Sequence, residues 1–362
     1  MLTLPVALLL PALWAAAPSR TAAAAVAAGY FLSSSRGLPQ GAAEFFGSSV
    51  SSGFVLWIAA ALPFVTVHAL LWTKREDWRR AGHYGLIIML MAVPPFGITG
   101  WAHPITAAGV LFPGWGWWGL GATAFGLSAM TTRLAPAVAL AAVVATGISA
   151  ADWSQPSNLE GWRGVDSSVG AAFGRADVFD QHRSLIAHVR QEATEGAKVI
   201  VFPESALGIL TLTVERLWVD ALADLDITVI AGAAVIHTEG YDAVMVALDR
   251  RGTRPLYRER MPVPVAMWQP WAKWFGLSGG ARATVFGDPV AEIAGHRFAP
   301  LICYEQLLVW PVLQSALHHP DAIVAIANGW WARNTSIPAI QRASVEAWAR
   351  LFDFALVTAF NR

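Results

Sequence analysis

The pattern of hydrophobic residues divides the chain near position 151. Before that point, long apolar stretches are nearly free of charge, and they cover positions 2–17, 22–33, 52–72, 84–100, 108–131 and 134–151. Most of them approach the roughly 20 residues that a helix needs to cross the apolar core of a bilayer. We therefore expect residues 1–151 to form an α-helical transmembrane bundle of about six helices, or about five if the short stretch 22–33 does not cross.

Two local features refine this predicted membrane region. Pro94, Pro95, Pro104 and Pro113 are expected to kink or end apolar segments, which a membrane tolerates when neighbouring groups bond the freed backbone. The first stretch has the apolar run of a signal peptide, but no basic segment precedes that run and further apolar stretches follow. A retained first helix is therefore the favoured interpretation, with a signal peptide as the alternative.

Lysine and arginine in the short loops predict the orientation, because positive charge is retained on the cytoplasmic side of a membrane. The loop 73–80 holds Lys74 and three arginines. Arg20 and Arg133 fall on the same side in this scheme, although Arg36 does not. We expect this loop to be cytoplasmic and the polar half of the chain to lie outside the cytoplasm.

From about residue 152, short apolar runs alternate with amphipathic stretches, which is typical of a layered α/β domain. Strands are expected at 199–202, 226–235, 242–249, 297–303, 321–327 and 354–360, and helices near 177–195, 213–223 and 338–352. No repeat and no low-complexity linker interrupts this part. We predict one domain over residues 152–362.

Composition supports two parts that occupy different solvents. The chain of 362 residues is 55% hydrophobic and 14% charged, with a formal net charge of zero. Residues 1–151 hold 7 basic and 3 acidic side chains, which is 10 of the 50 charges, so 40 fall in the remaining 211 residues. A balanced chain without a long basic run is not expected to bind nucleic acid directly.

The sequence offers no motif for a metal or a cofactor, and we expect neither. Its one cysteine, Cys303, excludes an intramolecular disulfide, and neither CxxC nor HExxH occurs. Residues 114–119 fit GxGxxG, but the strand, the helix and the polar unit that a dinucleotide site needs do not surround them. Packing of glycine and tryptophan at a membrane interface is the expected role of this segment.

Two strand ends carry residues with possible chemistry. Glu204 follows the strand 199–202 in the segment VIVFPES, and Cys303 ends the strand 297–303 in the segment LICYEQ. Functional groups of open α/β sheets collect beyond the carboxyl ends of the strands, so both residues are expected to face one crevice. Each alone also has a structural interpretation, as a cap or ion-pair partner and as a small buried thiol.

Together, VIVFPES and ICYE resemble the nitrilase, or carbon-nitrogen hydrolase, superfamily, with Glu204 and Cys303 separated by 99 positions (303 minus 204). The resemblance implies an α-β-β-α sandwich and a Glu-Lys-Cys triad, in which Glu204 is the general base and Cys303 the nucleophile that forms a thioester. The residue types suit this chemistry. A thiolate is the reactive form of cysteine, and a nearby carboxylate can take the thiol proton when an acyl donor arrives.

Several spans followed by one such domain resemble the layout of the apolipoprotein N-acyltransferase family. Asn328 and Trp331 in AIANGWW, and Gln341 in IQRASVEA, also fit that family's pattern. The resemblance implies that Tyr304, Glu305, Asn328 and Trp331 line a site for a lipid or an acylated substrate. Apolipoprotein N-acyltransferase activity itself is therefore one alternative function.

Two further segments resemble the TraB family of plasmid conjugal transfer proteins, which are membrane-bound relatives of the acyltransferase. They are YRERMPVPVAMWQPW at 257–271 and HPITAAGVLFPGWGW at 103–117. This resemblance implies a multi-pass protein of the bacterial inner membrane with its α/β domain on the periplasmic side. The lipid bilayer and proteins of the conjugation apparatus are the partners that it implies.

The lysine of the triad is missing from this chain. The family lysine lies five residues before the proline of a Val-Pro pair, and Val263-Pro264 places Glu259 at that position (264 minus 5). None of the chain's three lysines fits, and these are Lys74, Lys198 and Lys273. The lost contribution is that of one oxyanion-hole donor, about 3–4 kcal/mol.

Arg258 and Arg260 are the candidates to supply the missing positive charge. They flank Glu259, and on a regular strand they would point to the opposite face. A bulge of one residue would bring one of them inward. Arginine would stabilise an oxyanion, although it cannot shuttle a proton because it stays charged.

Other departures from the family lie near the end of the chain and around its tryptophans. Met267 stands where the family has a second glutamate, and the chain ends near where the family continues, which predicts a sheet edge that needs a partner or a cover. Trp268 and Trp271 either pack in the core or belong to an interfacial lid at the substrate site.

Two functions from different classes remain open. The first is a membrane-anchored thiol acyltransferase or amidase that uses Glu204 and Cys303. The second is a catalytically inactive nitrilase-like component that binds partners in the conjugation apparatus. The absent lysine favours the second function, and the retained motifs favour the first. A transporter has little support, because the spans lack the ionisable residues that mark a substrate path.

Overall fold

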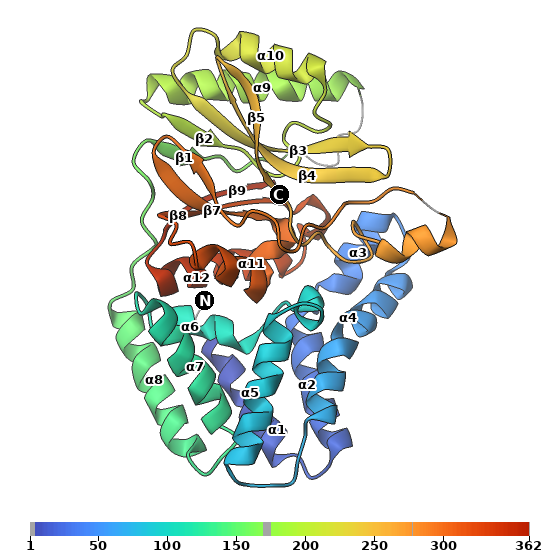
Figure 1. Ribbon diagram of the computed structural model, residues 1–362, viewed down its shortest axis with the longest axis vertical. Coiled ribbons are helices and arrows are strands. Elements are labelled where there is room, and N and C mark those ends of the chain that lie inside the picture. The colour runs from blue at the N-terminus through green and yellow to red at the C-terminus, as the bar shows by residue number, and fades with distance from the viewer. Residues whose placement is uncertain (1–3, 169–174, 277, 362) are drawn as a thin grey trace. The chain divides into compact units, whose positions relative to one another are not determined.

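The computed structural model describes residues 4–168, 175–276 and 278–361 (Figure 1). The chain divides into two compact units. The first comprises Met1–Pro156, Leu307–Val312 and Trp331–Phe354, and the second comprises Ser157–Gln306, Leu313–Trp330 and Ala355–Arg362. Two short pieces from the C-terminal half of the chain thus group with the N-terminal helices.

The first unit is built from helices. Their bounds are η1 Leu4–Leu8, α1 Leu9–Ala16, α2 Arg20–Ser34, α3 Leu38–Phe46, α4 Val50–Leu70, α5 Trp78–Ala92, η2 Phe96–Thr99, η3 Pro104–Ala107, α6 Ala108–Leu111, α7 Gly116–Ala129, α8 Ala135–Ala151, η6 Trp330–Ala332 at its boundary and α12 Ile337–Phe352. Trp14 is fully buried among them and donates a hydrogen bond from its indole nitrogen to the carbonyl oxygen of His68 over 2.9 Å. An aromatic interior therefore holds these helices together.

Among the described residues, α4 is the one helix long and apolar enough to cross a membrane, with 21 residues. The predicted bundle of about six spans is therefore not confirmed. The prolines explain part of the difference, because α5 ends at Ala92 just before Pro94, and α6 ends at Leu111 just before Pro113. The long stretches 84–100 and 108–131 are divided at these points.

Arg80 ties several helix ends of this unit together. Its Nε donates a hydrogen bond to the carbonyl oxygen of Thr131 over 2.7 Å, and its Nη1 donates one to the carbonyl oxygen of Ala15 over 3.1 Å. Carbonyl groups at helix C-termini lack partners within the helix, and an arginine satisfies them. The end of α1, the start of α5 and the turn after α7 therefore lie on the same side of the unit.

The second unit contains two β-sheets. The first sheet has the order β1 Trp162–Gly164, β2 Val199–Val201, β3 Thr228–His237, β4 Gly240–Asp249 and β5 Gly252–Arg258. The second has the order β6 Ala291–Ile293, β7 His296–Ile302, β8 Ala322–Asn328 and β9 Ala355–Asn361. Strands β1, β2 and β3 run parallel, as do β7, β8 and β9, and the remaining neighbours are antiparallel. Short helices η4 Pro270–Phe275, η5 Cys303–Leu307 and α11 Val309–Ala316 follow the strands, with α11 shared between the units.

Alternate residues of the two sheets form one core. Val199 and Val201 of β2 share it with Ile302 of β7 and Val324 of β8, as expected for strands whose side chains alternate between faces. The other face of the first sheet packs against α9 Arg175–Thr194 and α10 Leu212–Leu222, which lie together over it (Figure 1). The second unit thus contains one helical layer and the two sheets of the expected sandwich.

Strand β9 ends the second sheet, and the chain itself covers its outer edge. The backbone nitrogen of Leu356 donates to the carbonyl oxygen of Ser157, and that of Phe360 donates to the Asp166 carboxylate. The backbone nitrogen of Ser167 donates in turn to the carbonyl oxygen of Phe360 over 2.9 Å. The edge that was expected to need a partner or a cover therefore has a cover in residues 157–167.

The six strands and three helices predicted for the second half are all present, within about two residues of the predicted bounds. The prediction missed β1, β5, β6 and α11. The sequence of β5, GTRPLYR, contains Pro255 and two arginines and does not alternate between apolar and polar residues. Strands β1 and β6 have three residues each, which is too few for an alternating pattern to stand out.

Candidate active site

Cys303 lies at a sharp turn between a strand and a short helix. It follows β7 directly and begins η5, and its φ of 45° is in the left-handed region that a residue with a side chain rarely adopts. The residue is 8% exposed. Such a backbone conformation costs energy and tends to occur at functional sites, so the turn is an observation in favour of a role for the thiol.

Glu204 comes from the first sheet and meets Cys303. It follows β2 after buried Phe202 and Pro203, and its carboxylate accepts a hydrogen bond from the Cys303 thiol. The backbone nitrogen of Asn328, at the end of β8, donates a second hydrogen bond to Glu204 Oε2 over 3.0 Å. The structure therefore brings the carboxyl ends of three strands to one point.

Gly232 of β3 permits this approach. A Cβ added there would lie 2.6 Å from the Cα of Glu204 and 2.8 Å from the backbone nitrogen of Ser205. Real Cβ contacts are not that short, so only glycine lets β3 pass behind the turn that carries Glu204.

The surroundings shift the pKa values of both groups. Burial raises the pKa of Glu204 to about 7, although the hydrogen bonds from Cys303 and Asn328 oppose that shift. Burial also raises the pKa of the Cys303 thiol well above its ordinary value, and the charges of Glu204 and Glu259 raise it further. At neutral pH the cysteine is therefore a thiol at rest, and Glu204 is poised to accept its proton.

Glu305 is fully buried, and its carboxylate accepts hydrogen bonds from two segments near Cys303. Its Oε1 accepts hydrogen bonds from the Tyr257 hydroxyl over 2.6 Å and from the backbone nitrogens of Arg260 and Met261 over 2.8 and 3.2 Å. Its Oε2 accepts one from the backbone nitrogen of Ile302 over 2.8 Å. One carboxylate thus joins the chain after β5 to the residue before Cys303.

Arg260 is the counter-ion of the Glu305 carboxylate. Its Nε lies 3.9 Å from Glu305 Oε1 and donates a hydrogen bond to the Tyr257 hydroxyl over 2.8 Å. Its two terminal nitrogens donate to Gln314 Oε1 over 2.9 Å and to Ser315 Oγ over 3.0 Å. The fully buried guanidinium therefore has its donors occupied within the protein.

Arg258 lies on the other face of β5. It is exposed, and its Nε is 3.5 Å from Asp242 Oδ2, a carboxylate that also binds Arg282. The structure therefore gives both arginines partners other than Cys303, which does not support the expectation that one of them replaces the lysine. A register shift does interrupt the pairing of β4 with β5. Even so, the side chain that is buried next to Arg260 is that of Glu259, which lies between the two arginines in the sequence.

Glu259, at the position of the family lysine, is buried without a partner for its side chain. It is 1% exposed, and neither of its carboxylate oxygens has a hydrogen-bond partner in the structure. Burial raises the pKa of Glu259 well above its ordinary value, and the charges of Glu204 and Glu305 raise it further. Lys198 is no substitute, because it is exposed at the start of β2.

The remaining candidate residues are placed more widely. Tyr304 is partly exposed in η5, next to Cys303. Trp331 and Gln341 belong to the first unit, where the Trp331 ring packs on Gly41. Trp268 is partly exposed in the second unit.

The aromatic segment after Trp268 is exposed in the second unit. Trp271 is 36% exposed, while Trp274 and Phe275 are 83% and 74% exposed. Core packing is therefore excluded for the last two side chains and is poor for Trp271.

Sequence reasoning missed Tyr257, Gln314 and Ser315. Tyr257 precedes Glu259 by two residues on a strand, and this spacing indicates a shared face and was a usable signal. Gln314 and Ser315 come from α11, which was not predicted, so the sequence carried no signal for them.

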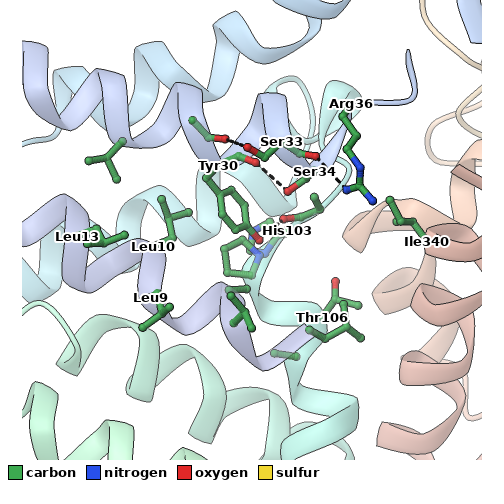
Figure 2. A pocket seen from close by; sticks show the side chains of 18 of the residues that line it. Leu9, Leu10, Leu13, Tyr30, Ser33, Ser34, Arg36, His103, Thr106 and Ile340 are labelled. Atoms are coloured by element: carbon green, nitrogen blue, oxygen red, sulfur yellow. Dashed lines mark hydrogen bonds between the residues drawn. The ribbon is translucent and has the colours of Figure 1, made fainter. Parts of the chain in front are cut away.

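The first unit contains a cavity of about 720 Å³ (Figure 2). Its lining includes Leu9, Leu10 and Leu13 of α1. Its polar groups include Tyr30 and His103. The Tyr30 hydroxyl donates to a backbone carbonyl, and both ring nitrogens of His103 bond backbone groups. None of its lining residues belongs to the cluster around Cys303.

The cluster around Cys303 holds a thiol, a carboxylate base and two further carboxyl groups. A thiol beside a base can attack an acyl carbon and form a thioester. Within residues 4–168, 175–276 and 278–361, no group of three or more His, Cys, Asp and Glu is arranged to hold a metal ion. The thiol and the adjacent carboxylate are the groups that nucleophilic chemistry requires.

Known proteins share sequence with most of this chain. The profile of the carbon-nitrogen hydrolase family matches residues 79–350. The conjugal transfer protein TraB of Agrobacterium fabrum is 55% identical over 99% of this chain and 88% of its own length. The apolipoprotein N-acyltransferase of Rhizobium meliloti is 29% identical over 45% of this chain and 34% of its own length. A crystal structure of an amidase from Nesterenkonia sp. covers 55% of this chain and 74% of that chain, with a TM-score of 0.40 at 14% identity.

Proposed function

We propose a function from the premise that this chain belongs to the carbon-nitrogen hydrolase family, as a relative of the conjugal transfer protein TraB. The function is Cys-dependent acyl transfer or amide hydrolysis by a membrane-bound protein that takes part in plasmid conjugation. The observation that carries it is the hydrogen bond between the Cys303 thiol and Glu204, whose pKa of about 7 suits a general base at neutral pH.

The proposed reaction has two covalent steps. Glu204 takes the proton of Cys303, and the sulfur attacks the carbonyl carbon of the acyl donor. The tetrahedral intermediate expels the donor's leaving group, which receives the proton from Glu204, and a thioester remains on Cys303. An amine or water then attacks the thioester and gives its proton to Glu204, which returns it to the departing sulfur.

The test is acylation of the full chain in detergent micelles. We expect p-nitrophenyl hexanoate to add one hexanoyl group at Cys303, seen by mass spectrometry and removed by neutral hydroxylamine, as a thioester is. Cys303→Ala removes the site and should show no adduct. If wild type remains unmodified with this ester and with thioester and amide donors, the proposed catalysis is wrong.

A catalytically inactive, partner-binding component of the conjugation apparatus is the second candidate. Glu259 favours it, because a carboxyl group stands where the family has a cation. The two candidates differ in what Cys303→Ala does to plasmid transfer. A partner surface would keep transfer at the wild-type frequency when the protein level is unchanged, whereas catalysis in transfer requires the thiol.

We also propose that the first unit lies in the bacterial inner membrane as a multi-pass bundle. Apolar side chains are exposed along α4 and α8, among them Val55 and Val143 at 69% each. A soluble monomer rarely exposes large apolar surfaces, whereas lipid covers them. The bilayer and a lipid or acylated substrate are the partners that suit these helices, the apolar cavity and the exposed Trp274.

The proposed orientation keeps the loop before α5 in the cytoplasm and the second unit in the periplasm. The contacts of Arg80 support it, because they gather three predicted cytoplasmic segments on one side of the first unit. In a Cys303→Ser background the chain has no cysteine. A membrane-impermeant maleimide should then label Arg183→Cys in spheroplasts, and Arg75→Cys only after permeabilisation. The reverse pattern would overturn this orientation.

A further inference from the structure

Glu259 has no task in the proposed acyl transfer and, unlike Glu305, no hydrogen-bond partner for its carboxyl group. We propose that Glu259 is held as a neutral carboxylic acid and donates a hydrogen bond to the carbonyl oxygen of the acyl donor when Cys303 attacks. This inference rests on the proposed function, and it names the group that takes over oxyanion stabilisation. The ligand atom is the oxygen of an ester, thioester or amide carbonyl.

The Glu259 carboxyl group has no hydrogen-bond partner, although the backbone of Glu259 is fixed by hydrogen bonds. Its backbone nitrogen donates to the carbonyl oxygen of Ala243 over 2.8 Å, and its carbonyl oxygen accepts from Thr284 Oγ1 over 3.2 Å. Both side-chain oxygens are buried without a partner. Buried polar atoms are nearly always hydrogen-bonded, so an exception beside a nucleophile points to a partner that arrives with the substrate.

The three carboxyl groups of the cluster differ in the hydrogen-bond donors around them. Glu305 has the counter-ion Arg260 and several donors, and Glu204 has the Asn328 nitrogen and the Cys303 thiol. Glu259 has neither. Two adjacent carboxyl groups without a cation, such as Glu204 and Glu259, cannot both ionise at low cost. The group without hydrogen-bond donors keeps its proton. Glu204 therefore holds the charge of a base, and Glu259 holds the proton of an acid.

Glu259 and Cys303 are held in place by the same carboxylate. The Glu305 carboxylate binds the backbone nitrogen of Arg260, which follows Glu259, and that of Ile302, which precedes Cys303. Glu259 and Cys303 are thus each one residue away from an anchor on the same carboxylate. Charge on Glu259 also acts on the Cys303 thiol and on Glu204, as expected for side chains that converge on one space.

The step balances without a further reactant. As the sulfur attacks, the electron pair of the carbonyl π bond moves to the oxygen, and the Glu259 O–H hydrogen-bonds to the developing anion. When the intermediate collapses, that pair re-forms the carbonyl and the leaving group departs with the proton from Glu204. Glu259 keeps its proton throughout. A neutral donor in a buried site stabilises the anion as other oxyanion-hole groups do.

The experiment compares Glu259→Gln with Glu259→Met in the full chain. Glutamine is neutral and still donates through its amide, whereas methionine has a similar length and no donor. The probe is p-nitrophenyl hexanoate, and the measured quantity is the burst rate of p-nitrophenolate release. We expect the glutamine variant to stay within about tenfold of wild type and the methionine variant to lose about 10²–10³-fold.

The possible outcomes separate this inference from the proposed function. If Glu259 were an ionised group that only repels the oxyanion, both variants would acylate faster than wild type. A methionine variant as fast as wild type, or faster, overturns the inference and leaves Cys303 acylation standing. Absence of any burst in wild type overturns both.

A second measurement reports the proton directly and needs no activity. Infrared spectroscopy of wild type at pH 7 should show the C=O stretching band of a buried, protonated carboxyl group, and Glu259→Gln should lack it. The other titratable groups that face Glu259 are Glu204, Glu305, Tyr241 and Cys303. A Glu204→Gln sample identifies any contribution of that carboxyl group. Absence of a band that depends on Glu259 would contradict the inference.

Discussion

A Glu204→Gln variant should form the Cys303 thioester about 10²–10⁴ times more slowly than wild type, because a positioned general base contributes that much to a proton transfer. Glutamine keeps the size of the side chain and cannot accept the thiol proton. The hexanoyl adduct, followed by mass spectrometry over time, measures the effect. Glu292→Gln is the matched control, since Glu292 is exposed on β6 and pairs with exposed Arg297.

The pH dependence of the same reaction follows from the raised pKa of Glu204. The base works only when it is ionised, so the wild-type acylation rate should rise with pH through about 7 and level off above that value. Upward shifts move the pKa values of Tyr241 and Cys303 away from this step. Burial also raises the pKa values of Glu259 and Glu305, so the assignment to Glu204 requires that the step persists in the Glu259→Gln variant. A rate that does not depend on pH between 5 and about 8.5 would contradict the assignment of Glu204 as the base.

Replacing Arg260 with methionine should destabilise the protein by about 3–5 kcal/mol, because the change leaves the buried Glu305 carboxylate without its cation. The free energy of unfolding of the full chain in detergent micelles can be followed through tryptophan fluorescence, since Trp162 and Trp218 are buried in the second unit. The variant also lacks the hydrogen bonds that Arg260 donates to Gln314 and Ser315, and their loss adds to the destabilisation.

Arg258→Met is the matched control for this change. Arg258 precedes Arg260 by two residues, but it is exposed and pairs with Asp242 at 3.5 Å. Asp242 is buried, but without Arg258 it keeps Arg282 at 2.6 Å and His237 at 3.0 Å, and the exposed arginine adds at most about 1 kcal/mol, so this variant should unfold close to wild type. Equal losses in the two variants would mean that the buried pair is not the source of the stability.

The strands could be predicted where a run of apolar residues in the sequence is also buried in the folded domain. Val199 to Val201 and Ala322 to Ala327 are apolar runs, and they form the buried strands β2 and β8. The helical unit was less predictable. Hydropathy reports that a segment is apolar, but the helix lengths also depend on where Pro94 and Pro113 interrupt the backbone.

The site was predictable in its identities more than in its geometry. Strand ends located Glu204 and Cys303, and the spacing before Pro264 located Glu259. The sequence did not indicate that Arg258 is exposed and Arg260 is buried. Arg258 stays on the outer face of β5, whereas the chain turns after that strand and buries Arg260 against Glu305. That turn depends on contacts with residues more than 40 positions away, which a local pattern does not encode.

The cover over β9 limits how this domain can assemble with other proteins. An open strand presents a row of unbonded N–H and C=O groups, which invites β-augmentation by a foreign strand and, at high concentration, aggregation. Residues 157–167 already occupy groups of that row at Leu356 and Phe360. A foreign strand would have to displace the chain's own segment to add to this edge, so any protein that docks there would have to be recognised through side chains.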